Sequence, residues 1–286
     1  MRGTGTLGRL AAAAAVIVLT GCSSAAAPKP SITDATIVVG IVDDAPGFAV
    51  GDKNPAGFDV DLMNAVGAGL HTPVAPTILT SRDRAGLLLN RKATVVIATY
   101  SITPQRNRDG IDFAGPYMVS PQALLVRADD NRITKKDDLT GRSVCTVKTT
   151  TGGGVHIPGA NMSTQMTTTQ ECIDLLAQGG TDAVFTDALI LYGYTHANAG
   201  KFKVILTGTF GELQYYGIGL LGKRHDDCLK LNQVITDYLR TQWRHDFQDT
   251  LQDAVAAYPG NEVNGGDFES HFKPKDSDMT TLSCKL

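Results

Sequence analysis

Short runs of β-branched residues alternate with helical stretches along most of the chain, and this order limits the fold classes open to it. Residues 36–42 (TIVVGIV) and 93–99 (ATVVIAT) are rich in Val, Ile and Thr, which is typical of buried strands. Between them, Leu62, Met63 and Val66 are spaced as one apolar stripe of an amphipathic helix. Strands and helices in this alternation predict an α/β protein whose sheets are covered by helices.

Weaker local signals fill in this pattern. We expect Asp59 to cap the helix that carries the apolar stripe, because aspartate is favoured at that position. Residues 73–79 and 143–147 are two further strand candidates, and residues 84–90 are a short helix candidate.

A sharper signal follows the strand expected at residues 93–99. Thr103 stands directly before Pro104, which combines a helix N-cap with the residue best suited to the first helical position. Backbone N–H groups at such a helix start favour an anion placed there. Arg106 adds a planar fork of donors that suits a carboxylate. The alternative is that Arg106 is paired on the helix surface.

The first residues are typical of an export signal. Residues 1–21 contain a basic start with Arg2 and Arg9, followed by an apolar stretch that is too short to span a bilayer. They end in L-T-G-C, which resembles the lipobox of bacterial lipoproteins and predicts that Cys22 is lipidated. Residues 22–35 then form a tether, and the protein is anchored on the outer face of the cytoplasmic membrane. The alternative is an ordinary secretory signal, cleaved near residues 25–27.

Composition narrows the classes of function. Of the 286 residues, 42% are hydrophobic and 19% charged, which supplies apolar cores and excludes a disordered, highly charged chain. A net charge of −3 argues against an extended basic surface for nucleic acid. Neither H-E-x-x-H nor G-x-S-x-G occurs, so two common hydrolase signatures are missing. The length predicts roughly two domains or lobes.

Four cysteines remain once the lipobox cysteine is set aside: Cys145, Cys172, Cys228 and Cys284. An even number in an exported protein predicts disulfides, and four cysteines allow three connectivities. No C-x-x-C spacing is present, which argues against a zinc ribbon or a redox pair. The alternative is buried free thiols.

Five segments together resemble one known family. They are GFDVDL at residues 57–62, ATYSITPQR at 98–106, DFAGPY at 112–117, DLTGRSVC at 138–145 and TDAVFTD at 181–187. In this order they are similar to the family 3 extracellular solute-binding proteins, the amino-acid-binding components of ABC importers. Within that family the chain most resembles binders of glutamate and glutamine.

The resemblance implies a type II periplasmic-binding-protein-like fold, with two α/β lobes joined by two hinge strands. Lobe 1 would comprise residues 36–126 and return with residues 220–286, which include the C-terminal tail, and lobe 2 would comprise residues 127–219. We expect the two crossings near residues 124–128 and 216–221. Since each pair then falls within one lobe, Cys145 would bond to Cys172 and Cys228 to Cys284.

The resemblance also assigns roles to individual side chains. Arg106 would bind the α-carboxylate of the amino acid, with help from Ser101 and Thr151. Asp187 would accept the ammonium group, together with the backbone carbonyl of Thr99. The alternative for Asp187 is the N-cap of the helix that follows it, and the two roles are compatible.

Arg84 would lie near a distal carboxylate of the ligand, and its alternative is a solvated helix charge. Two departures from the family pattern affect the pocket. Thr149 stands where the family usually has glycine, and Ala45 stands where many members place an aromatic residue over the ligand.

The implied function is binding of glutamate, glutamine or a related amino acid, and its delivery to ABC transporter permease subunits by hinge closure. The protein would act as a monomer, without cofactor, metal or nucleic acid, and would not be an enzyme. The alternatives are an exported enzyme on the same fold, such as a dehydratase or lytic transglycosylase, and a lipoprotein that senses a ligand and docks to a partner.

Overall fold

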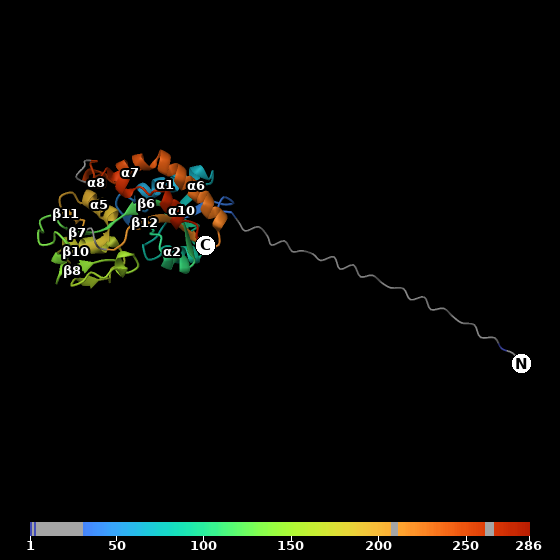
Figure 1. Cartoon of the computed structure of the whole chain (residues 1–286), viewed down its shortest axis with the longest axis horizontal. Helices are drawn as coiled ribbons and strands as arrows, with labels where there is room; N and C mark the ends of the chain where they lie inside the picture. Colours follow the sequence, from blue (N-terminus) through green and yellow to red (C-terminus); the bar gives the residue numbers. More distant parts are fainter. Residues whose placement is uncertain (2, 4–30, 207–210, 261–265) are drawn as a thin grey trace. The chain divides into compact units, whose positions relative to one another are not determined.

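The computed structural model describes residues 1, 3, 31–206, 211–260 and 266–286. The expected export signal, Cys22 and most of the tether lie outside the described residues. Within them the chain forms two five-stranded sheets and a two-stranded ribbon, flanked by helices (Figure 1). No helix in the described ranges is both long and apolar enough to cross a bilayer.

The first sheet has the strand order β4-β1-β5-β12-β6. Its strands β1, β4 and β5 are parallel, whereas β12 runs antiparallel to both of its neighbours. The five strands are β1 (Ile37–Ile41), β4 (Val74–Ile78), β5 (Val95–Val96), β6 (Ile111–Ser120) and β12 (Gln214–Leu221). All ten residues of β6 are buried, although it is an edge strand, because α6, α9 and α10 contact it.

Helices from both ends of the chain cover this first sheet. Figure 1 shows α1, α6 and α7 next to one another, and α1 contacts both of the others. The helices on this side are α1 (Phe58–Gly69), α2 (Arg84–Leu89), α3 (Pro104–Arg108), α6 (His225–Thr241), α7 (Trp243–Thr250), α8 (Gln252–Ala257), α9 (Phe268–Phe272) and α10 (Asp276–Leu282). The short ribbon of β2 (Asp44–Ala45) and β3 (Ala49–Val50) lies just before α1 in the chain.

The second sheet has the order β11-β7-β10-β8-β9. In Figure 1 its labelled strands lie together, apart from β6 and β12. The strands are β7 (Gln122–Arg127), β8 (Ser143–Cys145), β9 (Asn161–Ser163), β10 (Ala183–Asp187) and β11 (Phe202–Ile205). Two helices, α4 (Thr169–Ala177) and α5 (Ala188–Ala197), and two 3-10 turns, Lys136–Leu139 and Gly152–Gly154, belong to the same stretch of chain.

The chain passes between the sheets earlier than expected at both crossings. Residues 124–126 are part of β7, which pairs with β10 and β11 of the second sheet, so the outward crossing lies at Pro121. Residues 216–221 are part of β12 and already belong to the first sheet. The return therefore lies between Ile205 and Gln214. The expectation was wrong because an apolar strand does not reveal which sheet it pairs with.

Asp59 does not cap a helix. The N-cap of α1 is Gly57, and Asp59 lies inside the first turn, fully buried. The strand expected over residues 93–99 forms ladder pairs only at Val95 and Val96, although the backbone N–H groups of Thr94 and Ile97 also donate to carbonyls of β1.

Two disulfides join Cys145 to Cys172 and Cys228 to Cys284, which are the pairs that the lobe layout implies. The second one fixes the C-terminal segment against β6. There the backbone N–H of Cys284 donates to the Phe113 carbonyl at 2.8 Å, and those of Lys285 and Leu286 donate to the Asp112 carboxylate at 2.9 and 3.2 Å.

Candidate functional site

Two arginines converge on one aromatic ring beside the first sheet. The guanidinium carbon of Arg84 lies 4.9 Å from the centroid of the Tyr100 ring, and that of Arg106 lies 4.4 Å from it. Tyr100 is buried, so the ring is a rigid surface that both cations share. The arrangement concentrates two positive charges at the end of the strand that precedes α3.

Arg106 is placed by the helix start that the sequence predicts. Thr103 caps α3, because its Oγ1 accepts a hydrogen bond from the backbone N–H of Arg106 at 3.2 Å, and Pro104 opens the helix. The Nη1 of Arg106 donates to the carbonyl of Ser101. Its Nε and Nη2 form no hydrogen bond within the described ranges. Burial, together with the charge of Arg84, lowers the pKa of Arg106 to about 10.

Arg84 is buried, with only 4% of its surface exposed, so the alternative of a solvated helix charge is wrong. Its Nε donates to the carbonyl of Ser81 at 3.0 Å, and its Nη1 donates to the carbonyls of Ala98 and Thr99 at 2.9 and 3.1 Å. Burial lowers the pKa of Arg84. Its Nη2 makes no hydrogen bond to any residue that the structure describes.

Thr99 adopts a strained backbone conformation between two buried charges. Its φ of 44° lies in the left-handed region, which is uncommon for a β-branched residue. Its N–H donates to Asp59 Oδ2 at 3.0 Å, and its carbonyl accepts from Arg84. Asp59 also accepts from the hydroxyl of Tyr117 at 2.8 Å. The carbonyl that was expected to face an ammonium group is therefore already engaged by a guanidinium.

Asp59 and Tyr117 were not assigned to the site from the sequence. Both stand inside segments that carry the family resemblance, at residues 57–62 and 112–117, yet nothing in those segments shows that the two side chains meet. Burial raises the pKa of Asp59 to about 6, although its two hydrogen bonds act in the opposite direction. This carboxylate therefore holds the backbone of Thr99 from beneath the two arginines.

Asp187 comes from the second sheet, at the end of β10. Its Oδ2 accepts from the hydroxyl of Tyr216 at 2.7 Å, and its Oδ1 accepts from Nε2 of Gln122 at 3.4 Å. Burial raises the pKa of Asp187 to about 6, while these two bonds and the charges of Arg84 and Arg106 act to lower it. Asp187 is the N-cap residue of α5, as the alternative expected, but its side chain makes no capping hydrogen bond to the helix.

Thr151 lies beside Asp187 without contacting it. Its Oγ1 accepts from the same Nε2 of Gln122, at 3.4 Å. The loop that contains it continues into a single 3-10 turn, Gly152–Gly154.

One hydrogen bond ties the two groups of residues together. Tyr216 belongs to β12 of the first sheet and forms an isolated bridge with Ser101, while its hydroxyl reaches Asp187 of the second sheet. Arg84 and Arg106 therefore lie near one another on the side of the first sheet, and Asp187 and Thr151 on the side of the second. Guanidinium donors facing a carboxylate suit a small molecule that carries both an anionic and a cationic group.

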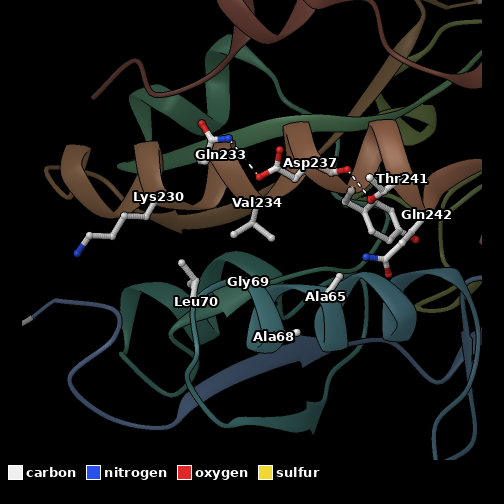
Figure 2. Close-up of a pocket in the computed structure, with 11 residues that line it drawn as sticks. Ala65, Ala68, Gly69, Leu70, Lys230, Gln233, Val234, Asp237, Thr241 and Gln242 are labelled. Carbon is white, nitrogen blue, oxygen red and sulfur yellow. Dashed lines mark hydrogen bonds between the residues drawn. The ribbon is translucent and has the colours of Figure 1, made fainter.

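A separate groove of about 310 Å³ lies between α1 and α6 (Figure 2). Val234 of α6 points toward Gly69 of α1, where a Cβ atom would lie 2.9 Å from it. Asp237 in this groove is already paired with Gln233 and Arg240. The groove therefore lacks the converging charged groups found around Tyr100. Among the described residues, no group of three or more His, Cys, Asp or Glu side chains could hold a metal ion.

Comparisons with known proteins agree on one family. The model of the bacterial extracellular solute-binding proteins, family 3, matches residues 37–257. Glutamate-binding protein GluB of Corynebacterium efficiens is 34% identical over 236 residues, which cover 74% of this chain and 80% of that protein. The glutamine-binding protein of Geobacillus stearothermophilus is 28% identical over 209 residues, covering 69% and 77%.

A solved structure of an ancestral arginine-binding protein bound to glutamine has a TM-score of 0.68 against this chain and is 25% identical to it. The alignment covers 75% of this chain and 97% of that one. The likeness extends through both sheets, since it spans most of the described residues.

Proposed function

Because the chain belongs to the bacterial extracellular solute-binding proteins of family 3, we propose that it binds an amino acid between its two sheets and delivers it to the permease of an ABC importer. The site supports this role through its charges. Arg106 would bind the α-carboxylate, with the backbone around Ser101 fixing its position, and Asp187 would accept the ammonium group. Thr151 would complete the site from the second sheet.

The preferred ligand in this proposal is an acidic amino acid, with L-glutamate as the first candidate. The observation that carries it is the pair of guanidinium groups on Tyr100, opposed from the second sheet by the buried carboxylate of Asp187. The buried carboxylate of Asp59 already accepts from Tyr117 and from the Thr99 backbone. Glutamate has two carboxylates and one ammonium group, so its charges complement this set one by one. Glutamine would leave the second cation without an anionic partner. The names of the two relatives described above, a glutamate binder and a glutamine binder, support the same pair of candidates.

The proposed mechanism is hinge closure around the crossing segments. A zwitterion held by Arg106 on one side and Asp187 on the other contacts both sheets only when they approach, so it stabilises the closed arrangement. At a micromolar Kd the binding free energy is about −8 kcal/mol, which a few charge-assisted hydrogen bonds can supply. The permease would then recognise the closed form of the monomer.

Delivery to a permease also requires the protein to be exported and kept near the membrane. We propose that Cys22 carries a lipid anchor on the outer face of the cytoplasmic membrane. In cells expressing the full chain, Cys22→Ser should move the protein from the membrane fraction to the medium or periplasm. Membrane retention of this variant would contradict the anchor while leaving ligand binding untouched.

A thermal-shift screen of the purified protein against the twenty amino acids tests the binding proposal. L-Glutamate should raise the melting temperature most, since a ligand at 100 times its Kd adds about 2.7 kcal/mol to the stability of the native state. A response to glutamine alone would overturn the charge argument. No response to any amino acid would overturn the proposed function and turn attention to an enzyme or a docking lipoprotein.

A further inference from the structure

Three consecutive residues at the outward crossing hold the turn that carries Asp187. Ser120 Oγ accepts from the backbone N–H of Leu189 at 3.2 Å, and the carbonyl of Pro121 accepts from the N–H of Ala188 at 2.8 Å. Gln122 then donates from Nε2 to the Asp187 carboxylate. The first N–H groups of α5 are thus satisfied by the crossing segment, which leaves the carboxylate free of any capping role.

Gln122 occupies a special place in this arrangement. It is the first residue of β7 and lies directly opposite Asp187 in the antiparallel pair, so the two side chains point to the same face of the sheet. It is 3% exposed, and Nε2 reaches Asp187 Oδ1 and Thr151 Oγ1 at 3.4 Å each. Its Oε1 is buried and has no hydrogen-bond partner among the described residues. A buried amide half of whose capacity is unmet is costly to keep, and glutamine is usually exposed.

The returning segment is shaped around this amide. Gly211, with a φ of +65°, approaches so closely that a Cβ atom there would lie 1.6 Å from Oε1 and 2.8 Å from Cδ of Gln122. Those distances are far below van der Waals contact, so any side chain at this position would displace the carboxamide. The amide is therefore confined between the returning segment on one side and the Asp187–Thr151 pair on the other.

From this geometry we propose that Gln122 is a positioning residue for the amino-acid site, whose carboxamide orients the Asp187 carboxylate and the Thr151 hydroxyl, with Gly211 leaving the space that this orientation needs. The inference rests on the proposed function, because it concerns the group that would accept the ammonium. It links Gln122 of the outward crossing and Gly211 of the returning segment to that group, so a change at either of these two residues is transmitted to Asp187.

Isothermal titration of the purified protein with L-glutamate tests the proposal. Gln122→Ala should weaken binding by about 10- to 100-fold, since the lost amide is a donor to a charged group. Gln214→Ala is the matched control, because Gln214 is another buried glutamine at the return crossing whose Nε2 donates only to the Glu212 carbonyl. It should bind L-glutamate as the unchanged protein does. If Gln122→Ala does not fold, Gln122→Met, which keeps the chain length without the donor, takes its place.

A double-mutant cycle separates positioning from general damage. Gly211→Ala should also weaken binding, partly through backbone strain and partly by displacing Gln122. In the double variant Gln122→Ala/Gly211→Ala there is no carboxamide left to displace. The fold increase in Kd should therefore be clearly smaller than the product of the fold increases in the two single variants. Independent, multiplicative effects would overturn the role assigned to Gly211.

The pH dependence of the affinity for L-glutamate distinguishes positioning from a simple loss of packing, because lost packing would not shift the pH at which affinity falls. Asp187 faces Arg84 and Arg106, Tyr216 and Gln122, and each of these favours its ionised form. Without the amide donor, the pH below which affinity for L-glutamate falls should move upward in Gln122→Met but not in Gln214→Ala. Wild-type affinity and an unshifted profile in Gln122→Met would overturn the proposal. Failure of the unchanged protein to bind any amino acid would instead overturn the proposed function.

Discussion

The two arginines of the site use their hydrogen-bond donors differently. Arg84 donates to three backbone carbonyls, of Ser81, Ala98 and Thr99, so most of its donors are spent on the protein itself. Arg106 donates to the carbonyl of Ser101 alone and keeps two of its nitrogen atoms free of hydrogen bonds to the described residues. Arg84 therefore supports the loop and contributes its positive charge to the site, whereas Arg106 has the donors to bind an anion directly.

This difference predicts the effect of a conservative change at Arg84. Arg84→Lys keeps the charge, but one ammonium cannot reach three carbonyls arranged for a planar fork. We expect the Kd values for glutamate and glutamine to rise together, by about tenfold or more, because each lost charge-assisted bond costs on the order of 1.5–3 kcal/mol. Arg82→Lys, at the exposed neighbour, is the control. A selective loss of glutamate binding, with glutamine unaffected, would contradict this and show that the Arg84 guanidinium bonds directly to the side-chain carboxylate of the ligand.

Removal of Arg106 should abolish the binding of every amino acid, and should not merely change which amino acid is preferred. In Arg106→Ala the α-carboxylate, which all amino acids share, loses its bidentate partner. Titration calorimetry should therefore detect no binding of glutamate, glutamine or arginine at millimolar concentrations. Arg108→Ala removes an exposed arginine two positions later, which bonds only to Gln105, and should bind normally. Glutamate affinity that survives in Arg106→Ala would contradict the clamp.

The raised pKa of Asp187 predicts that the affinity for the ligand falls at acidic pH. Burial raises its pKa from 3.8 to about 6, and only the ionised carboxylate attracts an ammonium group. Affinity should therefore be constant above about pH 7 and fall below pH 6, by up to tenfold per pH unit, the limit for uptake of one proton. Because the pKa of Asp59 is also raised to about 6, Asp187→Asn is needed for the assignment. That variant should bind weakly and lack the acid limb between pH 7 and 5.

Residues whose roles depend on near neighbours in the chain could be predicted, and those with distant partners could not. The Thr103–Pro104 helix start and its cap on Arg106 are set within four residues, and the structure confirms them. Asp59 meets Tyr117, 58 positions away, and so its interpretation as a helix cap was wrong. Gln122 escaped notice for the same reason, since only the strand pairing places it opposite Asp187.

At the scale of elements, sequence patterns located part of the helices and strands, while strand pairing set the crossings. The strand expected at residues 36–42 and the helix expected at 84–90 appear as β1 and α2. The centre of strand β7, residues 123–126, is apolar like the strands of the first sheet, so its membership of the second sheet follows only from its partners β10 and β11. Sequence patterns of this kind carry no information about partners.

The C-terminal segment beyond residue 257 lies outside the region matched by the family model, and its disulfide makes it an integral part of the first sheet. Cys228 and Cys284 are 56 residues apart, so Cys228→Ser/Cys284→Ser should lower the free energy of unfolding by about 4 kcal/mol in the chain-entropy model. Urea denaturation measures this loss. The Kd for glutamate should stay within about twofold, because the segment bonds to Asp112 and Phe113 of β6 and no described hydrogen bond joins it to Arg106 or Asp187. A large rise in Kd would contradict this separation.

On the scale of the whole folded region, α5 is the element that connects the second sheet to the rest. It begins at Asp187, and further along it Tyr194 donates from its hydroxyl to the Asp44 carbonyl. In the next two residues, Thr195 Oγ1 donates to Asp253 Oδ2 at 2.7 Å, and His196 Nδ1 lies 3.1 Å from Asp253 Oδ1. Gly193 permits this approach, since a Cβ atom there would lie 1.8 Å from the Pro46 carbonyl oxygen. The helix that follows Asp187 thus also contacts α8 and the ribbon before α1.

Asp253 therefore offers a way to change the closure of the protein without touching the site. In Asp253→Ala, Thr195 and His196 lose their partner on α8, which weakens the arrangement that brings Asp187 near Arg106. A ligand must then supply that lost free energy, so the Kd values for glutamate and glutamine should rise by the same factor, about 2- to 10-fold, and their ratio should stay constant. Asp249→Ala, on the exposed surface beside His245, should change neither value. A changed ratio would show that the α5–α8 contact shapes the site itself, and unchanged Kd values would show that it does not influence closure.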